Sequence, residues 1–137
     1  MTMRWRTNLA GLLCGLASFA GSSAQADELE GAWATDPSAC AQIFVMKNDK
    51  RSLAANSDAY GSGFIIEGDQ IRGKLVTCRI TRRKRDGNLV NLIASCSSDI
   101  DLSTVQFSLR LDREDVVTRI FPGMEGMEAS YSRCPAK

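Results

Sequence analysis

The chain of 137 residues contains no histidine. This absence excludes serine–histidine–aspartate and cysteine–histidine nucleophilic sites, and it excludes metal centres with imidazole ligands. No charge sign dominates either, because 17 lysines and arginines are set against 16 aspartates and glutamates. Balanced charge removes the general attraction to nucleic acid. We therefore expect no nucleic-acid partner, and no pattern in the sequence calls for a cofactor.

Long apolar runs are also scarce, and the longest lies at the N-terminus. Two arginines precede an apolar stretch over residues 9–20, and Ala-Gln-Ala at 24–26 has the small-residue pattern of a cleavage site. A membrane-spanning helix needs about 20 apolar residues, and Gly-Ser-Ser interrupts this run before that length. The sequence predicts a signal peptide over 1–26, no transmembrane segment, and a periplasmic or secreted domain over 27–137.

The exported domain has an even number of cysteines, which predicts disulfides in an oxidising compartment. Asp-Gly-Asn at 86–88 is a strong hairpin turn. A three-residue loop at this turn places Cys78 opposite Cys96, and the remaining pair is then Cys40 with Cys134. A structural zinc site would need closely spaced CxxC pairs, which the sequence lacks.

Alternating apolar and polar residues predict short β-strands along nearly the whole domain. The polar stretch 48–62 is either a lid-like loop or a single helical turn around 52–56. Eight strands in hairpin order, tied by a long-range disulfide, favour an all-β fold, a small antiparallel up-and-down barrel. The expected strands cover residues 29–35, 41–47, 63–66, 71–84 with a bend at Gly73, 89–96, 105–111, 116–120 and 128–133.

Two short motifs resemble the calycin group, which includes lipocalins, avidin-like proteins and small secreted bacterial protease inhibitors. Gly-Ala-Trp at 31–33 looks like its G-x-W signature. In that group the tryptophan packs on the barrel floor beneath a basic residue of the last strand, so the resemblance implies a structural floor of Gly31, Trp33 and Arg133. Tyr-Ser-Arg-Cys-Pro at 131–135 also resembles the ends of uncharacterised exported proteins of Gram-negative bacteria, and it implies no activity.

A basic cluster marks the tip of the hairpin that joins Cys78 to Cys96. Four cations in a row can bind the phosphate or sulfate group of a lipid or another polyanion. The alternative is a solvated edge that prevents strand-to-strand aggregation. Strand alternation favours the alternative, because it sends the second and fourth cations to one face and the first and third to the other. The cluster comprises Arg82, Arg83, Lys84 and Arg85.

Two further patterns have weaker chemical meaning. Met124 and Met127 supply two thioethers, which do not complete a copper site, so we expect them in an apolar loop that caps one barrel mouth. Catalysis without histidine would depend on carboxylates such as Asp36 and Glu67, and nothing in the sequence brings them together.

These observations predict a monomeric, non-catalytic binding or interaction module. Its expected partner is an envelope protein or a small amphipathic or anionic ligand. The first alternative is a secreted protease inhibitor, although the segment before Gly31 is short and acidic. A carboxylate-based enzyme is the second alternative.

Overall fold

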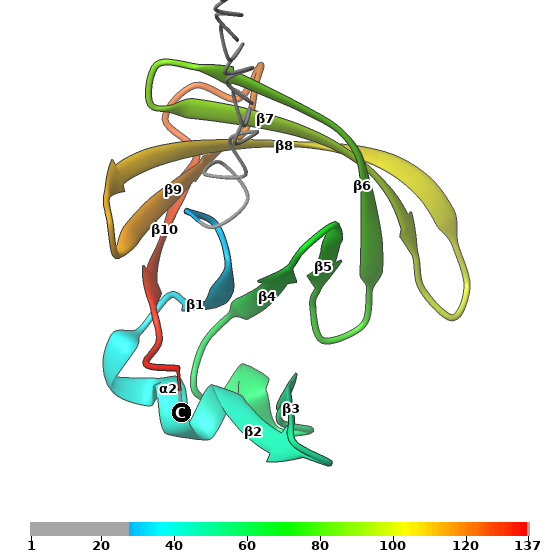
Figure 1. The fold of residues 1–137 in the computed structure, drawn as a ribbon, viewed down its shortest axis with the longest axis vertical. Coiled ribbons are helices and arrows are strands. Elements are labelled where there is room, and N and C mark those ends of the chain that lie inside the picture. Colours follow the sequence, from blue (N-terminus) through cyan, green and yellow to red (C-terminus); the bar gives the residue numbers. More distant parts are fainter. Residues whose placement is uncertain (1–27, 137) are drawn as a thin grey trace, which may run out of the picture.

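The computed structural model describes residues 28–136, and the predicted signal peptide lies outside this range. Eight antiparallel strands form a closed barrel (Figure 1), which confirms the predicted fold class. Closure occurs at the first strand, which pairs with the fourth strand on one side and with the last on the other. In barrel order the strands are β1 (Gly31–Ala34), β10 (Glu128–Arg133), β9 (Val116–Ile120), β8 (Leu102–Arg113), β7 (Leu89–Ser97), β6 (Thr77–Asp86), β5 (Gln70–Arg72) and β4 (Gly63–Glu67).

The connection from β1 to β4 is an insertion outside the barrel. The expected barrel strand over 41–47 is therefore wrong, because a short helix and a separate two-stranded hairpin occupy this region. The single helical turn lies over 57–59 and not around 52–56. The insertion contains η1 (Pro37–Ala39), α2 (Cys40–Ile43), β2 (Phe44–Lys47), β3 (Lys50–Leu53) and η2 (Ser57–Ala59).

The predicted number of eight barrel strands is nevertheless correct. The expected long strand over 71–84 is two strands, β5 and β6, because the chain turns between Gly73 and Val76. The amide of Gly73 donates to the carbonyl of Val76 at 2.8 Å and closes this turn. The additional strand replaces the one lost to the insertion.

Two apolar cores follow from this architecture. The main core lies inside the barrel around Trp33, Leu92 and Val117. The second core lies between the outer face of β1 and β4 and the insertion, where Ile43 and Cys134 are buried. In Figure 1 the insertion accordingly lies beside the C-terminal end of the chain. Strand alternation explains the two cores, since neighbouring residues of β1 and β4 face opposite sides of the sheet.

Both predicted disulfides are confirmed, Cys40–Cys134 and Cys78–Cys96. The register expected for the hairpin of the second pair is wrong at its tip. The turn has two residues, so Arg85 pairs with Val90 and not with Leu89. A bulge between Ile80 and Arg82 then shifts the ladder by one residue, which brings Cys78 opposite Cys96.

Arg133 covers the indole of Trp33 at the closed end of the barrel, 4.3 Å from its guanidinium carbon to the ring centroid. Trp33 is fully buried, and its Nε1 donates to the carbonyl of Leu29 at 2.9 Å. Arg133 also donates to three backbone carbonyls, those of Glu28, Glu30 and Glu114. These contacts tie the start of β1 and the β8–β9 turn to the last strand. Cys134 follows where β10 ends and faces the second core.

Candidate functional site

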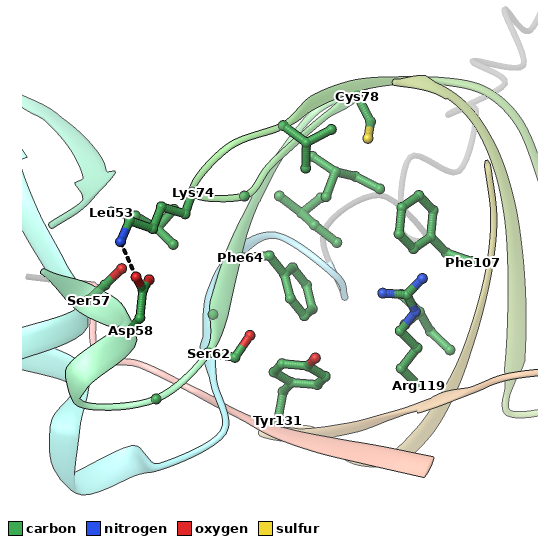
Figure 2. Close-up of a pocket in the computed structure, with 17 residues that line it drawn as sticks. Leu53, Ser57, Asp58, Ser62, Phe64, Lys74, Cys78, Phe107, Arg119 and Tyr131 are labelled. Carbon is green, nitrogen blue, oxygen red and sulfur yellow. Dashed lines mark hydrogen bonds and ion pairs between the residues drawn. The ribbon is translucent and has the colours of Figure 1, made fainter. Parts of the chain in front are cut away.

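The barrel is hollow at the end opposite Trp33. A cavity of about 480 Å³ opens there to solvent, and Figure 2 looks into it. Volumes of roughly 300–1,000 Å³ are usual for small-molecule sites. The rim consists of the insertion and the β5–β6 turn, with Leu53, Ser57, Asp58, Gly61, Ser62, Gly63, Gly73, Lys74 and Val76. The inner wall consists of Phe64, Ile66, Ile71, Cys78, Phe107, Leu109, Arg119 and Tyr131.

The two ends of the barrel differ in chemistry. Turns at the closed end are polar, namely Gly68-Asp69, Gly87-Asn88 and Glu114-Asp115. The register of the strands places the other connections at the cavity end. Most of the exposed large apolar side chains lie in or beside those connections, and one of them, Val76, also lines the cavity. They are Tyr60, Leu75, Val76, Ile100, Leu102, Met124 and Met127.

Arg119 is the one charged side chain that the described residues place on the inner wall of the cavity. It stands on β9 between the interior residue Val117 and Phe121, and its guanidinium carbon lies 4.7 Å from the ring centroids of Phe107 and Phe121. Within residues 28–136 no carboxylate lies within ion-pair distance of Arg119. Aromatic rings thus stand where a counter-ion would normally lie.

Tyr131 supplies a second polar group on the same wall. Only 9% of this residue is exposed, and its ring packs edge-on against Phe64 with centroids 4.9 Å apart. Its hydroxyl makes no hydrogen bond to any residue in the described part of the chain. Figure 2 shows Tyr131, Phe64 and Arg119 around the central space. Two donors on the inner wall, from Arg119 and Tyr131, therefore face a largely apolar part of the cavity.

An ion pair crosses part of the cavity rim. Lys74, in the β5–β6 turn, donates to the carboxylate of Asp58 in η2 (Figure 2). This hydrogen bond holds the pKa of Asp58 below its ordinary value. Lys74 is therefore already neutralised, which leaves Arg119 as the cavity cation without an acidic partner among residues 28–136.

The structure separates the four cations of the predicted basic tip. Arg83 pairs with Asp69 at 3.5 Å, and Arg85 pairs with Glu28. Arg82 and Lys84 lie on the exposed outer side of β6. The tip belongs to the closed end of the barrel, far along the strands from the cavity.

The other residues singled out by sequence do not form a site together. Asp36 caps η1, and hydrogen bonds from Ser38 lower its pKa. Glu67 pairs with Arg72 at 2.9 Å, at the opposite end of the β1–β4 ladder from Asp36. Met124 and Met127 lie in the β9–β10 connection at the cavity end, as expected, but their side chains are half exposed and do not line the cavity.

Sequence reasoning missed Arg119. Its signal is a charge among positions that alternate as interior residues, since Val117, Arg119 and Phe121 are two residues apart. One arginine in such a pattern is also typical of an exposed strand face. Only the position of the side chain inside the barrel distinguishes these two interpretations.

The fold and the cavity together define a closed antiparallel β-barrel that is hollow at one end, with a mainly apolar inner wall. No known protein family, no curated protein and no solved structure matches the chain. Among residues 28–136, no helix is long and apolar enough to span a membrane. In the same range no three acidic or cysteine side chains are grouped to hold a metal ion.

Proposed function

We propose that this protein is an exported, non-catalytic binding module that takes a small amphipathic molecule into the open end of its barrel. The cavity of about 480 Å³ is the observation that carries the proposal. Its wall is mainly aliphatic and aromatic, with few polar groups, as is usual for sites that bind small molecules. Further exposed apolar residues lie in the connections at the same end of the barrel.

The chemistry of the cavity supports binding over catalysis. Asp58 supplies the only carboxylate that residues 28–136 place on the cavity, and Lys74 engages it at the rim. The inner wall holds the guanidinium of Arg119 and the hydroxyl of Tyr131. Acid–base catalysis needs a pair of groups that exchange protons near neutral pH. An arginine and a tyrosine are instead suited to holding and orienting a ligand.

The two disulfides support the exported location, since such bonds persist in oxidising compartments. We propose that the mature chain begins at Asp27, in the periplasm or outside the cell. The intact mass of the exported protein tests the cleavage, and alkylation without prior reduction should label no thiol.

A probe titration tests the binding function. The neutral apolar dye N-phenyl-1-naphthylamine should fluoresce on entering the cavity and saturate at about one equivalent. V76W adds bulk to a residue that lines the rim, whereas the neighbouring Leu75 is 79% exposed and does not line it. We expect V76W to weaken binding about tenfold or more and the control L75W to change it less than about twofold.

Absence of saturable binding, or equal effects of V76W and L75W, would overturn the proposal. Tight inhibition of a secreted protease by the purified protein would instead favour the protease-inhibitor alternative.

A further inference from the structure

We infer that the ligand is a single-chain carboxylate, bound with its head group at Arg119 and its apolar chain inside the barrel. This inference rests on the proposed binding function and names its ligand class. It begins from Arg119, which faces an apolar cavity without an acidic partner among the described residues.

A guanidinium in such a place attracts an anion. Because no carboxylate among residues 28–136 pairs with Arg119, its N–H donors are available, and these donors match a planar carboxylate in a two-point hydrogen bond. The rings of Phe107 and Phe121 hold the guanidinium in position. A held arginine loses less side-chain freedom when the anion arrives, which favours binding.

The charge balance of the cavity selects a head group with one negative charge. Lys74 is neutralised by Asp58 at the rim, so one positive charge remains on the cavity side of the described chain. A carboxylate balances it. A phosphate monoester carries close to two negative charges near neutral pH, and the second would be left without a partner in an apolar surrounding.

Tyr131 can supply a further hydrogen bond. Tyr131 lines the cavity and is only 9% exposed. Its hydroxyl makes no hydrogen bond within residues 28–136. Figure 2 shows the Tyr131 and Arg119 side chains entering the cavity from the same side of the barrel. An oxygen of the ligand head group would satisfy this donor.

The direction of the chain follows from the strand order. Arg119 lies on β9, and the order of the eight strands places β5, with its neighbours β4 and β6, on the opposite wall of the barrel. Three apolar side chains of that wall line the cavity, namely Ile66, Ile71 and Cys78. With the carboxylate at Arg119, the apolar chain therefore extends across the cavity towards these side chains.

Calorimetric titration with three ten-carbon probes tests the inference. Decanoate, decanol and decyl sulfate share one chain and differ in the head group. For the wild type we expect decanoate to bind about tenfold or more tightly than decanol. R119M keeps the apolar stem against the two rings and removes the charge, so it should bring decanoate to the affinity of decanol. R119K should retain part of the preference, and Y131F should weaken decanoate more than decanol.

Arg113 provides the matched control, because its side chain is 73% exposed and lies at the closed end. R113M removes the same charge and should leave the preference for decanoate unchanged. Dye binding by R119M shows that the variant is folded and the cavity intact.

The outcomes separate the two proposals. If neither decanol nor the dye binds, the binding function fails. If both bind but decanoate gains nothing over decanol, or R119M keeps the preference, only the carboxylate assignment fails and Arg119 is structural. Stronger binding of decyl sulfate than decanoate would reassign the head group to a sulfate.

Discussion

Individual residues differ in how well their roles can be read from the sequence. The contact between Trp33 and Arg133 could be predicted, because a G-x-W motif and an arginine in the last strand together imply it. Position 31 favours glycine, since its φ is +121° and an added Cβ would lie 3.3 Å from Nη1 of Arg133. The role of Arg119 could not be predicted from the sequence, because it depends on side chains that β4, β8 and β10 bring next to it.

Arg133 should contribute strongly to stability. R133M removes the cation–π contact with Trp33 and leaves three backbone carbonyls at the closed end without their donor. We expect the free energy of unfolding to fall by about 2–4 kcal/mol. Urea denaturation followed by Trp33 fluorescence measures it, with the exposed Arg79 changed to methionine as control. A loss no larger than that of R79M would contradict the floor role.

Asp112 should make stability depend on acid pH. The hydroxyl of Thr118 and the guanidinium of Arg110 donate to its carboxylate and lower its pKa. A pKa lower in the folded than in the unfolded chain stabilises the fold above the unfolded value of about 3.9, and this contribution disappears as the pH falls through the folded value.

Urea denaturation of D112N across pH tests this linkage. At pH 7 the variant should be less stable than the wild type by about 1 kcal/mol, and the two should converge below the folded pKa of Asp112. D115N is the control, since Asp115 is 69% exposed and 3.7 Å from Arg113. A difference that stays constant down to strongly acid pH would refute the assignment.

Strands were predicted correctly where the alternation of apolar and polar residues agreed with the residues of the turns. The hairpin of β6 and β7 has both, and its disulfide was found even though the turn length was wrong, because the bulge after Ile80 compensated for it. The insertion was misread because Ile43, Phe44 and Val45 form an apolar run that suits a strand. Tertiary packing on the outside of β1 and β4 decides its helix and its separate hairpin.

The two disulfides should contribute unequally. Cys40–Cys134 spans 94 residues and holds the insertion to the end of β10, whereas Cys78–Cys96 spans 18. The chain-entropy model gives the longer bridge about 1.5 kcal/mol more stabilisation. Thermal and urea unfolding of the double alanine variants C40A/C134A and C78A/C96A compare them. A larger loss for C78A/C96A would show that core packing outweighs the entropy of the chain.

At the scale of the whole molecule, the ends of the barrel have separate roles. Trp33 and Arg133 close one end among polar turns, whereas the other end opens into a cavity with a mainly apolar inner wall that includes Arg119. The barrel class followed from strand count and hairpin order. The cavity could not be predicted in this way, because an unfilled space in the interior depends on how side chains from many strands pack together.

Methyl NMR during titration with decanoate tests the central claim most directly. Ile66, Ile71 and Leu109 line the cavity, whereas Ile43 lies in the second core and Ile100, 95% exposed, lies in a loop. Binding inside the barrel predicts shifts at the three cavity residues that saturate together at about one equivalent, with Ile43 unchanged. Shifts confined to Ile100, or no saturable shift at the cavity residues, would contradict it.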